Sequence, residues 1–159
     1  MVNWQRWRKS PAELAYIRQG TAIVTSIHET IRKRVEPGLL KNELVAEIFA
    51  SGIRGAEGVG GDYPAIVPLL PTGIEASAAH LTWNDKSFER GAAMYFEFAG
   101  CVNHYHAPLC RTVNLDKPPQ SLLGAEQAVL EGVAAGIEPA RAGNTATHIA
   151  CAFYGAVTA

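Results

Sequence analysis

A helical repeat of apolar residues runs through the first quarter of the chain. Ser10, Pro11 and Glu13 form a capping box with proline in the first turn, which predicts that a helix begins here. Its apolar positions are Leu14, Ile17, Val24, Ile27 and Ile31. Glu36-Pro37-Gly38 supplies a breaker and a turn, so the pattern predicts one long amphipathic helix over about 11–34.

A second helix is predicted directly after this turn, over about 41–53. Its expected buried residues are Leu44, Val45, Ile48 and Phe49. Several glycines then end the helical pattern, at positions 52, 55, 58, 60 and 61. The following apolar run, 65–70, is framed by prolines, which is typical of an edge strand or a strained strand.

The middle of the chain predicts an antiparallel hairpin. Its strand candidates are 94–99 and 109–113, joined through residues 100–108. Beyond the proline pair at 118–119 the pattern returns to helix, over about 122–137 and again from Thr145. The expected fold class is therefore α/β (α+β), with antiparallel strands and long helices packed on one face.

The two helix pairs share a short internal echo. Val35-Glu36-Pro37 is similar to Ile137-Glu138-Pro139, and Asn42 corresponds to Asn144. In both cases the matching residues are 102 positions apart. A duplicated unit would place strands after the second helix pair. The sequence instead stops at Ala159 inside a helical pattern, so we expect residues 1–159 to be a truncated domain. Chance is a fair alternative explanation of so short a match.

Composition narrows the class of partner. The chain has 159 residues, 48% of them hydrophobic, with 14 Lys and Arg against 15 Asp and Glu in no block. This balanced charge gives no basic or acidic patch that would bind nucleic acid or a membrane surface. The expected binding partner is therefore a small molecule or another protein chain. Neither an apolar export signal nor a run of about 18 apolar residues is present. Three cysteines without C-x-x-C spacing predict reduced thiols in the cytoplasm, at Cys101, Cys110 and Cys151.

Glu97 is the most informative residue, because it interrupts the apolar strand Tyr95-Phe96-Glu97-Phe98. A carboxylate buried among aromatic side chains must be paired, bind a metal or have a raised pKa. The alternative is that strand alternation points Glu97 to solvent. His80 precedes this strand in the segment His80–Asp85, and an imidazole can move protons near neutral pH.

The order of these motifs resembles the creatinase/aminopeptidase P/methionine aminopeptidase superfamily, also called M24 or pita-bread enzymes. The similarity covers almost the whole chain. The matching features are the helix start at 9–14, the turn at 35–38, His80, Gly91, Glu97 and Arg111-Thr112. The resemblance implies that these residues form the first half of a pita-bread fold, that His80 is the active-site histidine, and that homodimers form.

The resemblance also bears on metal binding. Metal-dependent members carry an Asp where Glu97 stands, and a second Asp three residues before the Arg-Thr pair, a position taken here by Pro108. Proline cannot bind a metal through its side chain, so we expect no metal and no other cofactor. Creatinase is similar in lacking these carboxylates. The segments 96–100 and 104–112 resemble ectoine hydrolases, which open a cyclic amidine, so Glu97 and His80 are the expected catalytic residues.

Other residues are expected to bind substrate. His104 and His106 lie two apart and would share a face of a strand, where they could line the pocket, bind a metal or be solvated turn residues. Tyr105 could pack on a delocalised ring, and Arg111 could pair with a carboxylate or a main-chain carbonyl. Two rivals stay open: a prolidase-like metallopeptidase with a rearranged site, and a non-catalytic pita-bread binding module.

Overall fold

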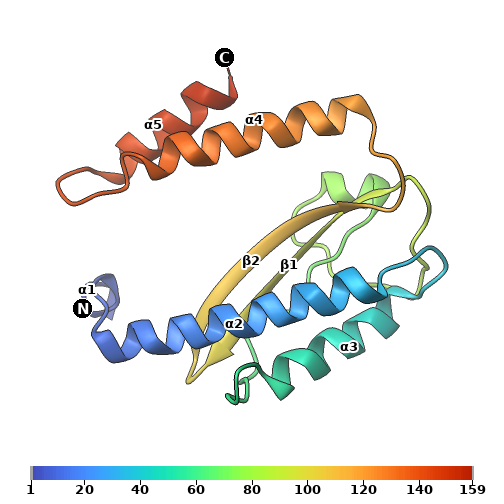
Figure 1. Cartoon of the computed structure of the whole chain (residues 1–159), viewed down its shortest axis with the longest axis horizontal. Helices are drawn as coiled ribbons and strands as arrows, with labels where there is room; N and C mark the ends of the chain where they lie inside the picture. Colours follow the sequence, from blue (N-terminus) through green and yellow to red (C-terminus); the bar gives the residue numbers. More distant parts are fainter. Residues whose placement is uncertain (1, 159) are drawn as a thin grey trace. The chain divides into compact units, whose positions relative to one another are not determined.

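The computed structural model describes residues 2–158, and the side chains of all of these except residues 2 and 3 (Figure 1). Contacts divide the described chain after Asp116 into two compact units. The first holds helices α1 (Val2–Trp7), α2 (Pro11–Arg34) and α3 (Lys41–Arg54), a short 3₁₀ helix η1 (Gly73–Ser77), and strands β1 (Ala93–Val102) and β2 (Tyr105–Asn114). The second holds α4 (Gln120–Ile137) and α5 (Ala146–Val157).

The predicted long helix is confirmed as α2. Its capping box is complete: the Glu13 backbone N–H donates to Ser10 Oγ at 3.3 Å, and the Ser10 N–H donates to the Glu13 carboxylate at 2.6 Å. The predicted second helix is confirmed as α3, one residue longer than expected. Apolar residues of both helices form the core with the strands, the most deeply buried being Ile23, Ile31, Leu44, Leu70, Phe88 and Phe96.

The predicted hairpin is confirmed, but its turn is far shorter than expected. β1 and β2 pair from Ala93–Asn114 to Val102–Tyr105, which leaves only Asn103 and His104 in the turn. Both turn residues have positive φ, of 48° and 63°, as a two-residue type I′ hairpin requires. The expected connection over 100–108 was wrong because these residues continue the two strands.

The proline-framed run at 65–70 is not a regular strand. It forms a single bridge, in which the Leu69 and Glu97 backbones exchange hydrogen bonds of 3.0 and 3.1 Å. Pro64, Pro68 and Pro71 remove N–H donors from this stretch, so a longer ladder cannot form. Leu69 and Leu70 are nevertheless buried, which explains the apolar pattern.

Alternation along β1 separates the two faces of the hairpin. Met94, Phe96 and Phe98 are buried in the core beneath the helices, and α2 packs on both strands. Contact is closest where α2 crosses β1, since a Cβ added to Gly100 would lie 2.0 Å from the Gly20 carbonyl oxygen. Glu97 lies on the opposite face. The expected mixed fold, with helices on one face of antiparallel strands, is therefore confirmed (Figure 1).

The second unit is a helical hairpin of α4 and α5. The two predicted helices are confirmed, with α4 beginning two residues earlier than expected. They approach closely at Gly132, where an added Cβ would lie 2.5 Å from Val157 Cγ2. None of the helices in the described residues is long and apolar enough to cross a membrane. The proposed internal duplication stays a prediction.

Candidate active site

Glu97 stands in the middle of β1, half-buried, and pairs across the hairpin with Cys110. Its backbone N–H and carbonyl bond to Leu69 on the free edge of β1, so Glu97 and Cys110 form a non-hydrogen-bonded pair. Side chains approach most closely in such pairs. The pKa of the Cys110 thiol is raised, first by burial and then by the negative charge of Glu97. The carboxylate and thiol are therefore direct neighbours.

His80 lies in a turn shortly after η1 and is exposed, with a positive φ of 63°. Tyr95, which shares a face of β1 with Glu97, donates its hydroxyl to the Ala78 carbonyl at 3.3 Å. A bridge between Thr72 and Met94 holds the other end of η1 against β1. The turn that carries His80 is thus attached to the strand that carries Glu97.

A buried ion pair anchors η1, and sequence reasoning did not identify it. The Lys41 side chain is 1% exposed and its ammonium lies 2.7 Å from the Glu75 carboxylate, which also accepts a hydrogen bond from Asn84 at 3.1 Å. The hydrogen bond from Lys41 is the main reason that the pKa of Glu75 is lowered. A lysine at the first position of a helix gave no signal of burial, because such positions usually face solvent.

Tyr105 and Arg111 lie on the helix-covered face of the hairpin, opposite the face of Glu97. The Tyr105 hydroxyl donates to the Glu13 carboxylate at 2.9 Å, and this bond is the main cause of its raised pKa. Its ring stacks on Tyr16 with centroids 5.6 Å apart. Arg111 pairs with Phe96 across the strands and donates to the Cys110 carbonyl at 2.6 Å, one of the two expected contacts.

His104 and His106 have different surroundings. The Ala65 N–H donates to His106 Nε2 at 2.8 Å, and His106 Nδ1 lies 2.8 Å from the His104 carbonyl oxygen. These contacts tie the 62–68 loop to β2. His104 occupies the hairpin turn, is exposed, and makes an edge contact with the Tyr63 ring at 5.5 Å.

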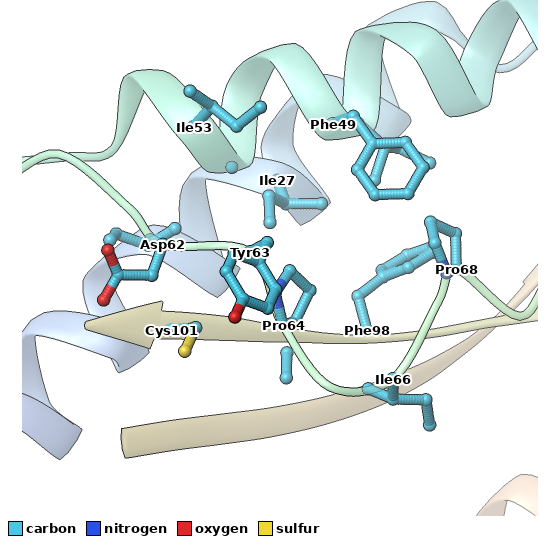
Figure 2. Close-up of a pocket in the computed structure, with 14 residues that line it drawn as sticks. Ile27, Phe49, Ile53, Asp62, Tyr63, Pro64, Ile66, Pro68, Phe98 and Cys101 are labelled. Atoms are coloured by element: carbon cyan, nitrogen blue, oxygen red, sulfur yellow. The ribbon is translucent and has the colours of Figure 1, made fainter. Parts of the chain in front are cut away.

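A small apolar cavity of about 40 Å³ lies between α2, α3, β1 and the loop at 62–68 (Figure 2). Its lining includes Ile27, Phe49, Ile53, Tyr63, Phe98 and Cys101. Neither Glu97 nor His80 lines it. The cavity is therefore separate from the group formed by Glu97, Cys110 and the His80 turn.

A family model described as metallopeptidase family M24 matches residues 15–159. The chain belongs to this family. It is 50% identical over 157 residues to the ectoine hydrolase of Halomonas elongata, a match that covers 96% of this chain and 39% of that protein. The chain therefore spans about two fifths of the length of the curated relatives that it matches. The resemblance to this superfamily inferred from the sequence motifs is confirmed.

Solved structures of the family share the fold. The prolidase of Pyrococcus furiosus superposes with a TM-score of 0.85 at 20% identity, covering 94% of this chain and 43% of its own. The X-Pro aminopeptidase of Thermotoga maritima MSB8 superposes with a TM-score of 0.84 at 23% identity, and the match covers 99% of this chain and 43% of that protein. At these identities the likeness establishes the fold alone. The expected pita-bread class is confirmed for the described residues.

The M24 hairpin of this chain does not fit a pair of metal-binding carboxylates. Glu97 is the one acidic residue among the described residues of β1 and β2. On its face of the hairpin, the neighbouring positions of β2 carry Pro108 and Cys110. A pair of divalent cations of the kind bound by carboxylates requires several oxygen or nitrogen ligands, which these strands do not supply.

Proposed function

We propose that this chain carries part of the active site of an M24 hydrolase that opens the ring of ectoine, or of a similar small cyclic amidine, without a metal ion. The single observation that supports the proposal is Glu97, a strand carboxylate beside Cys110 at the position where the family resemblance implies a metal ligand, in a chain 50% identical to an ectoine hydrolase. A carboxylate that holds no metal is available as a nucleophile or base.

The proposed chemistry divides between two side chains. Glu97 attacks the amidine carbon, or removes a proton from the water that attacks it, and His80 gives a proton to the nitrogen that leaves. The C–N bond then breaks. Where Glu97 has attacked directly, water cleaves the bond between its oxygen and the amidine carbon, so by either route the elements of water are added across the C–N bond. The attachment of the His80 turn to β1 through Tyr95 supports this pairing, because it holds that turn against the strand that carries Glu97.

Substrate contacts are proposed on the same face. His106 pairs with Cys101 and so shares the face of Glu97, and its ring, held by the Ala65 N–H, could line a small-molecule site. His104, Tyr105 and Arg111 stay predicted substrate contacts, although Tyr105 and Arg111 are engaged with other groups in this structure. The homodimer and the cytoplasmic location also stay predictions.

The test is Glu97→Gln in a protein of the full length of the relatives, assayed for ectoine ring opening. The variant keeps the shape of the side chain and removes its charge, so turnover should fall by about 10²–10⁴, with little change in KM. Glu89→Gln, at an exposed position next to the core residue Phe88, is the matched control and should keep parental turnover. Turnover of the Glu97 variant within a factor of about three of the parent would remove Glu97 from the mechanism.

The two rivals predict different outcomes. A prolidase-like metallopeptidase would cleave dipeptides that end in proline, lose activity with a chelator and regain it with manganese or zinc. The proposed hydrolase should keep ectoine opening unchanged after chelation. A non-catalytic module would show neither reaction in the full-length protein, while still binding a partner.

A further inference from the structure

A second group of reactive side chains meets at the turn of the hairpin, four residues along β1 from Glu97. The carboxylate of Asp62, the thiol of Cys101 and the imidazole of His104 each offer one ligand atom, and these atoms all lie within 4.8 Å of one another. Within residues 2–158, no other set of three such side chains gathers in this way. Figure 2 shows Asp62 and Cys101 side by side at the end of β1.

The backbone holds both partners against Cys101. The Asp62 N–H donates to the Cys101 carbonyl at 2.8 Å, and His104 lies in the two-residue turn that directly follows β1. Burial, and after it the negative charge of Asp62, raise the pKa of the Cys101 thiol, while the backbone of His104 acts in the opposite direction. Cys101 itself is 1% exposed and therefore fixed, whereas Asp62 and His104 reach solvent.

We propose that Asp62, Cys101 and His104 bind one zinc ion, with a water molecule as the fourth ligand. Mixed sulfur, nitrogen and oxygen ligands in a set of three suit Zn²⁺, whereas magnesium and calcium require oxygen ligands. On binding, the Cys101 thiol proton passes to solvent and the sulfur coordinates as a thiolate. The site uses neither Glu97 nor His80, the two residues proposed above to carry out ring opening, although it includes His104, one of the predicted substrate contacts.

The geometry permits this coordination after a small adjustment. Zinc bonds of about 2.0–2.3 Å at tetrahedral angles place the ligand atoms about 3.3–3.8 Å apart. The ligand atoms of Asp62, Cys101 and His104 lie within 4.8 Å of one another, so they need to approach by about 1–1.5 Å at most. Because Asp62 and His104 are at the surface, rotation of their side chains can close the difference while Cys101 stays in place. His104 lies in the two-residue turn that directly follows β1, the strand that carries Cys101.

The expected effect of the ion is to fasten the loop after α3 to the hairpin turn. Asp62 begins the 62–68 loop, which lines the apolar cavity. The next residue, Leu69, forms backbone hydrogen bonds with Glu97. Zinc would therefore limit opening of this loop without taking part in the reaction at Glu97.

Cobalt titration tests the site, because Co²⁺ replaces zinc and is coloured. The 159-residue chain, kept reduced and metal-free, should bind one Co²⁺ with a thiolate-to-cobalt charge-transfer band and visible bands of a four-coordinate ion, and Zn²⁺ should displace it. Cys101→Ser should abolish the charge-transfer band. Asp62→Asn and His104→Asn should each weaken Co²⁺ binding by at least about 10–100-fold. That is the loss seen when a residue that only hydrogen-bonds to a metal ligand is removed, and loss of a ligand itself should cost no less.

Controls separate this site from the exposed thiols. The double variant Cys110→Ser/Cys151→Ser removes both surface cysteines and should keep the band and the affinity. Asparagine at position 104 tolerates the positive φ, so His104→Asn tests the imidazole in a folded protein even if Cys101→Ser fails to fold. Absence of the band in the parent, its loss in the double variant, or unchanged affinity in both the Asp62 and His104 variants would overturn the proposal.

Discussion

Removing the Glu75 carboxylate should cost far more stability than removing its partner Lys41. Lys41 is buried at 1% exposure, whereas the Glu75 side chain is 24% exposed and keeps Asn84 as a hydrogen-bond donor. Glu75→Ala leaves a buried ammonium without its countercharge, which costs about 3–5 kcal/mol. Lys41→Met replaces the ammonium with an apolar chain of similar length and leaves a carboxylate that can hydrate, so we expect a loss of about 1–2 kcal/mol.

The double variant tests whether the two charges are energetically coupled. In Lys41→Met/Glu75→Ala no charge stays buried, so the double variant should be more stable than Glu75→Ala alone. Urea unfolding at pH 7, followed by the fluorescence of Trp83, which packs against the core, gives the three free energies. If the double variant loses the sum of the two single losses, the pair is not coupled and this reasoning is refuted.

An exposed ion pair supplies the matched control. Arg34 and Glu47 have side-chain exposures of 53% and 35%, so Glu47→Ala should cost no more than about 1 kcal/mol. The pH dependence has a definite sign: because the pKa of Glu75 is lowered in the folded state, its stabilisation is fully present above the unfolded value of 4.5 and is lost as pH falls through the lower folded value. The difference between the parent and Glu75→Gln should therefore shrink below pH 4.5.

Three further predictions concern packing, pH and association. Gly100→Ala should lower the free energy of unfolding by about 1–3 kcal/mol because its Cβ would meet the α2 backbone, whereas Gly124→Ala, in open space on α4, should raise helix stability by up to about 1 kcal/mol in thermal unfolding. Burial lowers the pKa of His28, so the parent should lose stability as pH falls below 6.5 and His28→Gln should lose less in urea unfolding. Light scattering should show dimers that Leu130→Glu, on an exposed apolar position, weakens; a monomer at all concentrations would contradict this.

Most of the fold could be predicted from local sequence patterns. The limits of α2 could be predicted because the capping box, the apolar repeat and the Pro-Gly turn all act within a few residues of each boundary. The hairpin turn could not, because asparagine and histidine at positive φ are a weak signal, and Gly100 suggested a loop. Gly100 instead allows α2 to approach β1, a contact with Gly20 eighty residues earlier in the chain that no local pattern reveals.

The candidate site divides in the same way. Strand alternation left two choices for Glu97, and the register now places it away from the core and beside Cys110. Residues that act through distant partners escaped prediction: Lys41 and Glu75 are joined across a loop, and Asp62 meets the hairpin turn only in the folded chain. Nothing in the local sequence around these residues predicts the contacts, which form only when distant parts of the chain meet in the folded structure.

Pro108 also restricts the register of the hairpin. Because proline has no N–H, it cannot occupy a hydrogen-bonded pair of the ladder, and here it faces Ala99 in a non-hydrogen-bonded pair. A slip of one residue would place Pro108 in a hydrogen-bonded pair and turn the β2 face that now lies beside Glu97 toward the helices. Pro108, which stands where the family resemblance implies a metal-binding carboxylate, therefore also favours the register that sets Glu97 beside Cys110.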